Sequence, residues 1–266
     1  FHTQVLGMRD NNGIYLTNGI AVKQEYPLSE ASLNAAIRKF DTIHEKFLGE
    51  SRCFFAVVAD KGYYLAAPSG HLAMDYDALY EKLGAGLPWA EQIDLRRCLT
   101  AGDYYRTDTH WRQECLIPAA TAICDALEVT APKAADYSEV QADKPFYGVY
   151  YGQAALPMEP DTLTWLENET LRQCTVYDYE TGKTGSVYDT AKLTESRDMY
   201  DVFLSGARAL LTIENPNAKT DRELLVFRDS FGSSLVPLLL GDYARVTLVD
   251  IRYVSSEKLD SFLDFH

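Results

Sequence analysis

A carboxylate and an imidazole stand two residues apart in the aromatic stretch GDYYRTDTHW, residues 102–111. A histidine can remove the proton of a hydroxyl when a carboxylate orients its ring and stabilises the imidazolium. In an extended segment residues i and i+2 point to the same side, so Asp108 can reach one ring nitrogen of His110 and leave the other free. The pair therefore predicts a general base that needs a hydroxyl to act on.

Ser230 is the hydroxyl that this base can activate. It follows the apolar run ELLVF, residues 223–227, in the turn RDSFG, and a segment of helical pattern comes next. A strand, a sharp turn and a helix in this order present a hydroxyl and aim backbone N–H groups at a developing oxyanion. Gly232 is small enough for the backbone to approach a substrate. Asp229 and Ser230 can also simply cap the helix, so the prediction of catalysis depends on both stretches together.

The elements around these stretches predict an α/β fold. Apolar residues recur at helical spacing over residues 28–50, with Ser29 as N-cap and Gly49 at the end. The apolar run over residues 53–59 is typical of a strand buried on both faces, which favours a parallel sheet covered by helices. Strand, helix and strand over residues 223–254 predict a βαβ unit with a parallel pair. Further helices are predicted at residues 72–83 and 111–127, and a further strand at residues 91–99.

The middle of the chain differs in composition from the rest. Residues 130–190 are richer in Tyr, Gly and Pro, and CTVYDYETGKTGSVYD, residues 174–189, predicts a hairpin. Its Gly-Lys-Thr lacks the preceding glycine and the following helix of a phosphate-binding loop. We therefore predict one domain over residues 1–266, with residues 130–190 as an insertion or subdomain.

Composition and charge exclude several classes of protein. The chain has 266 residues, is 47% hydrophobic and carries a net charge of −14, so we expect a packed core and repulsion from nucleic acid and anionic lipid. Its longest apolar runs fall short of the ~20 residues that cross a bilayer. Five cysteines without a CxxC pair indicate buried free thiols. Because the chain begins at Phe1 instead of Met, we expect that a signal peptide or membrane anchor was removed.

The two chemical stretches together resemble a known family. LLVFRDSFGSSLVPLL and YYRTDTHW are similar to the DHHW-motif proteins, Gram-positive relatives of the SGNH-hydrolase-like alginate O-acetyltransferase proteins. Thr109 stands where the family has the first histidine of its His-His pair, so only His110 can take the catalytic position. Softer similarities extend over most of the chain: NGIYL near the start, FYGVYYG at residues 146–152, YDVFLSG at residues 200–206 and VTLVDIRYV near the end.

The resemblance implies both a fold and an activity. The fold is an SGNH-like three-layer α/β/α arrangement with a central, mainly parallel sheet and a small β-rich insertion. Asp108, His110 and Ser230 take the positions of a catalytic triad, with no cofactor and no metal ion. The implied activity is O-acetyl transfer on a cell-surface or secreted glycan outside the cytoplasm. A membrane-bound O-acyltransferase often supplies the acetyl groups, and is therefore the implied partner.

One departure from the family concerns the oxyanion hole. After FLSG the family often has an asparagine, whereas this chain continues Gly206-Ala207-Arg208. The N–H of Gly206 remains a candidate donor, and other donors can replace the missing amide. The full set of oxyanion and substrate-binding candidates is Gly206, Arg208, Asp229, Gly232, Tyr105, Arg106 and Trp111.

Several functions stay open at the level of sequence. The acyl-serine can pass its acetyl group to a sugar (a transferase) or to water (an esterase). A carbohydrate-binding or scaffold protein with a decayed site is a second class, and the altered Gly206 region favours it modestly. A metal-dependent hydrolase using Asp108 and His110 is a third, although the chain has no HxH or HExxH pattern. Tyrosines at residues 146–152 and 177–188 are the candidate wall of an acceptor groove, because aromatic rings stack on sugars.

Overall fold

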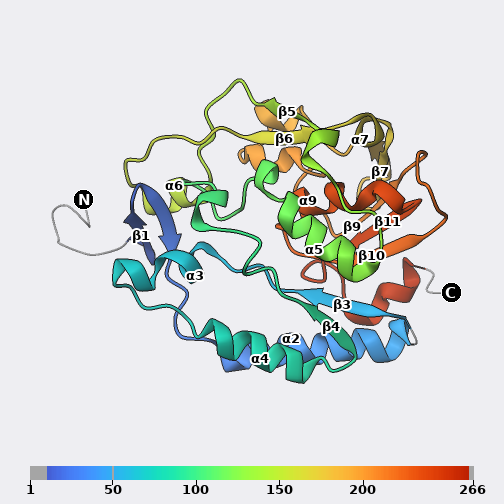
Figure 1. Cartoon of the computed structure of the whole chain (residues 1–266), viewed down its shortest axis with the longest axis horizontal. Helices are drawn as coiled ribbons and strands as arrows, with labels where there is room; N and C mark the ends of the chain where they lie inside the picture. Colours follow the sequence, from blue (N-terminus) through green and yellow to red (C-terminus); the bar gives the residue numbers. More distant parts are fainter. Residues whose placement is uncertain (1–10, 50, 264–266) are drawn as a thin grey trace.

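The computed structural model describes residues 11–49 and 51–263, and a five-stranded sheet lies in its C-terminal half (Figure 1). The outer residues of the predicted single domain, 1–10 and 264–266, lie outside the described part. The strands of this sheet, in spatial order, are β10 (Glu223–Phe227), β11 (Arg245–Val249), β9 (Leu210–Glu214), β7 (Thr175–Asp178) and β8 (Lys183–Gly185).

This sheet is mixed, not mainly parallel as the sequence suggested. β10 and β11 are parallel, which confirms the predicted βαβ unit, whereas β9 runs antiparallel to both β11 and β7, and β8 is antiparallel to β7. The prediction of a mainly parallel sheet was wrong because an apolar run indicates that both faces of a strand are buried, and does not indicate the direction of the strand. Four of the five residues of β9 are buried, although both its pairings are antiparallel.

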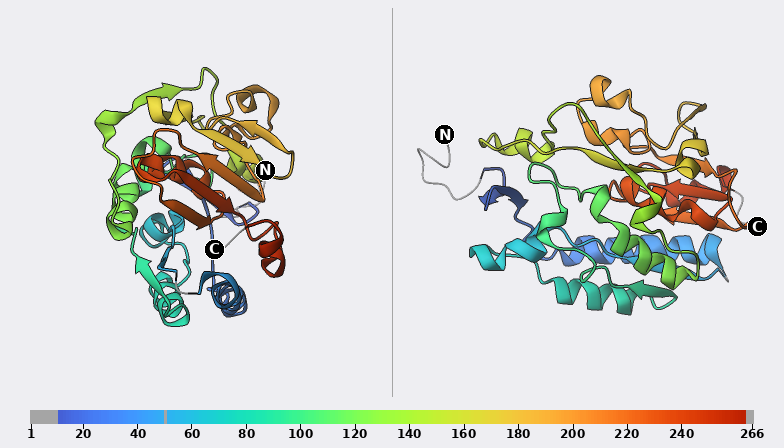
Figure 2. Two further views of the ribbon diagram at one scale, coloured as in Figure 1. Left: turned by 90° about the vertical axis from the view of Figure 1, so that its right-hand side faces the viewer. Right: turned by 45° about the horizontal axis from the view of Figure 1, so that its top comes forward.

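Residues of the sheet alternate between two hydrophobic clusters, so both faces are covered. Leu225 and Phe227 of β10 pack with Phe40 and Ile43 of helix α2 (Glu30–Ile43) on one face. Leu224 and Val226 face the other cluster, which contains Val236 and Leu240 of a 3₁₀ segment (Val236–Asp242). The two views of Figure 2 show α2 on one side of the sheet, away from the 3₁₀ segment Val236–Asp242.

Helix α2 begins and ends at the residues that the sequence indicated. The Ser29 side chain accepts a hydrogen bond from the N–H of Ser32 at 3.3 Å, and a π-helical turn (His44–Leu48) continues the helix to Gly49, whose φ is 41°. This φ lies in the left-handed region, which glycine adopts without a steric cost. Helix α4 (Tyr76–Gly86) runs beside α2 (Figure 1).

Two prolines set the ends of shorter helices. Helix α5 (Ile117–Leu127) begins late within the predicted span 111–127, because Pro118 fits the first turn of a helix but not its interior. Helix α9 (Gly232–Leu235) is only four residues long and passes into the 3₁₀ segment that contains Pro237. The remaining helices are α3 (Lys61–Leu65), α6 (Val149–Ala154), α7 (Glu169–Gln173) and α8 (Lys192–Glu195).

Three strand pairs lie outside the main sheet: antiparallel β1 (Ile14–Thr17) and β2 (Ile20–Lys23), parallel β3 (Cys53–Ala56) and β4 (Ala90–Ile93), and antiparallel β5 (Ser138–Gln141) and β6 (Thr164–Glu167). Within residues 130–190, β7 and β8 form the predicted hairpin, and β7 joins the main sheet through β9. This region therefore contributes two strands to the central sheet as well as the separate β5–β6 pair.

All five cysteines are free thiols, and Cys124 and Cys174 are buried. Among the described residues, no helix combines the length and the apolar character that crossing a bilayer requires.

Candidate active site

The stretch that carries Asp108 and His110 forms a closed loop between β4 and α5. Tyr104 and Trp111 pair as an antiparallel bridge at its base. The N–H of Tyr105 donates to the carbonyl of His110 at 3.1 Å. The loop is therefore a narrow, hairpin-like structure and not the extended segment that the sequence suggested.

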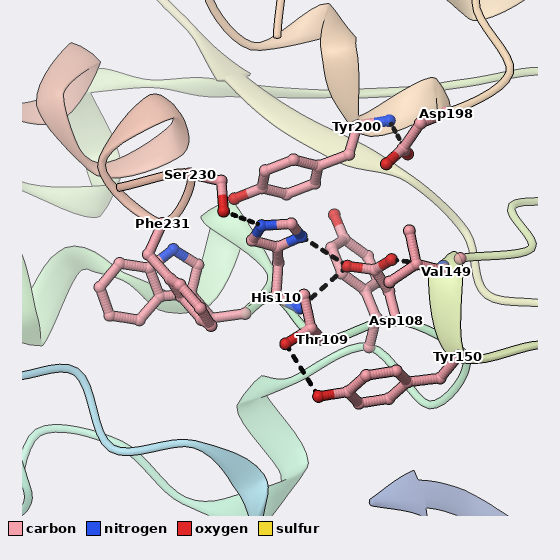
Figure 3. Close-up of polar contacts among 12 residues, drawn as sticks. Asp108, Thr109, His110, Val149, Tyr150, Asp198, Tyr200, Ser230 and Phe231 are labelled. Atoms are coloured by element: carbon pink, nitrogen blue, oxygen red, sulfur yellow. Dashed lines mark hydrogen bonds and ion pairs between the residues drawn. The ribbon is translucent and has the colours of Figure 1, made fainter. Parts of the chain in front are cut away.

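Asp108, His110 and Ser230 lie in one line of hydrogen bonds (Figure 3). Asp108 Oδ1 lies 2.6 Å from His110 Nδ1 and also accepts the His110 N–H at 2.9 Å, which folds the two residues toward each other. On the far side of the ring, His110 Nε2 lies 2.8 Å from Ser230 Oγ. Because a carboxylate only accepts hydrogen bonds, Nδ1 carries the proton and Nε2 is free to accept one from Ser230.

The Asp108 side chain is fully buried yet has hydrogen-bond donors for both oxygens. Its Oδ2 accepts the N–H of Val149 at 2.8 Å. Burial alone would raise the pKa of Asp108, but the hydrogen bonds and charge of His110 and the Val149 N–H outweigh it and lower the pKa. Gly148 permits this close approach, since a Cβ there would lie 2.2 Å from the Asp108 Cβ. The carboxylate is thus held charged beside the imidazole.

Aromatic rings hold the plane of His110, which is 5% exposed. Tyr200 stacks on the imidazole with ring centroids 3.9 Å apart and planes 7° apart, and the Phe231 ring lies at 4.9 Å. The Tyr200 hydroxyl and Trp111 Nε1 both contact the buried Ser234 Oγ, at 2.7 and 2.9 Å. Sequence reasoning missed Tyr200, although it lies in a stretch that carried the family resemblance.

The turn that presents Ser230 is shaped by its neighbours. Asp229 Oδ1 accepts the N–H of Phe231 at 2.9 Å, so Asp229 forms the turn instead of capping a long helix. The buried Arg228 guanidinium donates to the carbonyl of Asp229 at 3.2 Å and to Ser233 Oγ at 3.0 Å. Gly232 is required here, because a Cβ would lie 2.7 Å from the Cβ of Arg228.

One backbone donor in this turn is open. The N–H groups of Phe231 and Gly232 are occupied by Asp229 Oδ1 and the Asp229 carbonyl, whereas that of Ser230 has no acceptor among the described residues. Gly206 is less suited to the oxyanion role expected from sequence, since its N–H donates to the Phe203 carbonyl at 3.1 Å.

The other predicted binding residues divide into buried and surface groups. Tyr105 and Trp111 are fully buried and pack in the core, because each ring meets other aromatic rings there, so neither faces a substrate. Arg208 pairs with Asp178 at 3.2 Å. Arg106 donates to the Pro160 carbonyl at 2.7 Å and lies between two cavities of about 430 and 440 Å³, both lined in part by its side chain.

Four tyrosines of the predicted groove wall are exposed and two are buried. Tyr147 and Tyr151 form one surface pair with ring centroids 4.5 Å apart, and Tyr177 and Tyr179 form another at 4.9 Å. Phe146, Tyr150 and Tyr188 are buried. The described residues contain no group of three or more His, Cys, Asp or Glu side chains placed to hold a metal ion.

Comparisons with known proteins place the fold. A crystal structure of a DHHW family protein from Eubacterium siraeum is similar with a TM-score of 0.74 and 22% identity, over 93% of this chain and 86% of that one. Bacillus cereus PatB1 is similar in two structures: one with a sulfonyl adduct (TM-score 0.69, 15% identity, 93% and 90% covered) and one without it (0.66, 17%, 90% and 88%). No curated protein matches the chain.

These neighbours share a mixed α/β fold with the chain. Family membership comes from sequence, since the sequence model described as DHHW protein matches residues 80–249. The match spans both the Asp108–His110 loop and the Ser230 turn. The chain belongs to the DHHW protein family.

Proposed function

We propose that this protein is a serine-dependent O-acetyltransferase that acts on an extracytoplasmic glycan. The observation that carries the proposal is the uninterrupted line of hydrogen bonds from Asp108 through His110 to Ser230 (Figure 3). A histidine with a carboxylate on one nitrogen and a hydroxyl on the other is the arrangement that activates serine for acyl transfer.

The reaction proceeds by double displacement. Ser230 Oγ adds to the carbonyl of an acetyl ester while its proton moves to His110 Nε2, and the donor alcohol leaves with that proton. An acceptor hydroxyl then gives its proton to His110 Nε2 and attacks acetyl-Ser230. The product ester departs, and the proton on His110 returns to Ser230 Oγ. Asp108 stabilises the imidazolium in both halves of the reaction.

The open N–H of Ser230 supplies a donor for the oxyanion that forms on the acetyl carbonyl. It belongs to the nucleophile itself, so it lies beside the carbon under attack. This donor can replace the asparagine that is missing after Gly206, so stabilisation of the oxyanion need not depend on that region.

A glycan acceptor is supported by two exposed tyrosines in the segment that binds Asp108. Tyr147 and Tyr151 flank Val149, whose N–H holds Asp108. Tyrosine faces stack on sugar rings while their hydroxyls stay in water. The net charge of −14 disfavours nucleic acid as a ligand. By family resemblance, we place the protein outside the cytoplasm, with a membrane-bound O-acyltransferase as the source of acetyl groups.

The test offers the protein an activated acetyl ester with and without candidate cell-wall and secreted glycans. Mass spectrometry then compares the amounts of acetylated glycan and free acetate. We expect acetylated glycan to form only with wild-type protein and not with Ser230→Ala. Free acetate as the sole product across the panel would identify an esterase, and no turnover or acyl-serine at all would identify a non-catalytic protein.

A further inference from the structure

We propose that Lys61 is a positioning residue, which fixes the loop of residues 105–108 so that Asp108 meets His110. This inference rests on the proposed role of the triad. Lys61 opens helix α3 and lies outside residues 80–249, the part of the chain that matches the family. The N-terminal region thus contributes to the site through a side chain that the motifs do not contain.

The Lys61 ammonium binds the loop through two carbonyl oxygens. Its Nζ donates to the Asp108 carbonyl at 2.7 Å and to the Tyr105 carbonyl at 3.0 Å. It also lies 4.9 Å from the centre of the Tyr150 ring, a cation–π contact. Lys61 is 2% exposed, so these contacts take the place of water around its charge.

A carboxylate binds the same loop through its amides. Asp161, 7% exposed, accepts the N–H of Arg106 at 2.9 Å and the N–H of Thr107 at 2.8 Å. The Thr107 hydroxyl adds a third bond to it at 2.6 Å. The cation therefore holds the carbonyls of residues 105 and 108, and the anion holds the amides between them.

The remaining carbonyls of this loop are bound by backbone. The Arg106 carbonyl accepts from Ala21 of β2 at 2.9 Å, and the Thr107 carbonyl accepts from Tyr151 of α6 at 3.1 Å. With all four carbonyls bound, the loop has little freedom to move Asp108. Lys61 and Asp161 thus act as a clamp on the loop of residues 105–108. Displacements of about 1 Å in a catalytic group can lower the rate about 10²-fold, so this clamp matters to catalysis.

The charge of Lys61 makes this role sensitive to pH. Burial lowers the pKa of Lys61 to about 7, against the opposing pull of Asp108, Asp161 and Asp60. The charges of these three carboxylates act on the ammonium, and the neutral Tyr150 ring also contacts it. Above neutral pH the amine loses its charge and holds the two carbonyls more weakly, because charge-assisted hydrogen bonds are about twice as strong as neutral ones.

The experiment measures how fast phenylmethanesulfonyl fluoride modifies Ser230 between pH 5 and 10, by peptide mass spectrometry. In wild-type protein we expect the rate to fall several-fold above pH ~7. Lys61→Met is expected to lower the rate about 10–100-fold at pH 6.5. Lys61→Arg is expected to keep most of the rate and to abolish the alkaline fall, since a guanidinium stays protonated.

Two further variants separate positioning from folding. Asp161→Asn weakens the other half of the clamp, so we expect a lower rate with the alkaline fall retained. Asn215→Ala removes another buried hydrogen bond to a carbonyl, that of Leu240 at 2.8 Å, far from the loop in sequence. It is expected to lower the melting temperature and leave the pH profile unchanged.

A second readout does not depend on reactivity. The His110 Nδ1 proton, shared with Asp108 at 2.6 Å, is expected at low field in ¹H NMR and to shift or broaden in Lys61→Met but not in Asn215→Ala. If wild-type Ser230 does not react, the proposed function fails and this resonance alone decides the role of Lys61. An unchanged resonance together with an unchanged pH profile in the Lys61 variants would overturn the inference.

Discussion

The Ser230–His110 contact and the Ser69–His71 contact have similar geometry. In each, a serine hydroxyl lies near a ring nitrogen, at 2.8 and 3.1 Å, and the imidazole stacks on a tyrosine with the planes 7° apart. Ring stacking and a Ser–His contact are therefore not enough to distinguish an active site.

The two contacts differ in where the protons lie. Ser69 Oγ points at the carbonyls of Leu65 and Ala66, at 2.6 and 3.0 Å, so its only proton is engaged and His71 can only donate to it. No carboxylate bonds to His71 within residues 11–49 and 51–263. At His110, Asp108 fixes the proton on Nδ1 and leaves Nε2 to accept from Ser230. The carboxylate and the direction of the hydroxyl are thus what make the difference.

Replacing each serine with alanine should give the largest difference in turnover between the two contacts. We expect Ser230→Ala to lose nearly all turnover of an activated acetyl ester, at least about 10³-fold, because the acyl group then has no attachment point. The matched Ser69→Ala should retain wild-type turnover. Both rates are measured by release of the chromophoric alcohol. Equal losses in both variants would show that the contacts do not differ in function.

Removing the carboxylate should make the Ser230–His110 contact resemble the Ser69–His71 contact. Asp108→Asn keeps the shape of the side chain but can stabilise the wrong tautomer of His110, and we expect kcat/KM to fall by about 10³–10⁴-fold. The same ester assay measures this, with circular dichroism to check folding. A fall of less than tenfold would mean that His110 does not need Asp108.

A methyl group behind Asp108 tests the precision of its placement. In Gly148→Ala the new Cβ would lie 2.2 Å from the Asp108 Cβ, so we expect the Val149 hydrogen bond to break and kcat to fall about 10–100-fold. Gly152→Ala, in the same helix region but with nothing within 4 Å of its Cβ, is the control and should keep full activity. If both variants match wild type, the close approach has no functional value.

The smallest expected effect concerns stability near the triad. Burial, and secondarily the charge of Asp108, raise the pKa of Asp198 to about 6, and Asp198 caps the segment that carries Tyr200. The folded state therefore binds more protons than the unfolded state between pH ~4 and ~6, so its stability falls as pH rises through that window. Between pH ~4 and ~6, we expect the free energy of unfolding of the wild-type protein to decrease by on the order of 2 kcal/mol more than that of Asp198→Asn. Urea titrations of both proteins at the two pH values measure this decrease. If the difference in stability between wild type and Asp198→Asn is the same at both pH values, the pKa of Asp198 is not raised.

Sequence reasoning predicted which side chains come together at the candidate site better than it predicted the architecture. Asp108, His110 and Ser230 were identifiable because the two stretches that carry them occur together in one chain, and the hydrogen-bond distances between their side chains are those expected. The direction of β9 was not predictable, because a strand covered on both faces has the same apolar pattern whether parallel or antiparallel. Helix boundaries were predictable where a cap or a proline fixes them, as at Ser29 and Pro118.

The supporting residues could not be found from sequence for a different reason. Lys61 and Asp161 reach the loop from positions with no local signal, and Lys61 in particular reads as an ordinary surface lysine until its burial is known. Tyr105 and Trp111 lie close to Asp108 and His110 in sequence, yet they point into the core. Adjacency in a motif therefore predicts the motif's place in the fold but not the direction of each side chain.

The most direct test of the central claim is to locate the reactive serine. A sulfonyl fluoride is a suitable probe because it sulfonylates a serine hydroxyl that an adjacent general base activates. After treatment and proteolysis, mass spectrometry should find one adduct, on Ser230, that is absent from His110→Ala and never present on Ser69. Modification of Ser69 to the same extent, or an unmodified Ser230 in wild-type protein, would contradict the account.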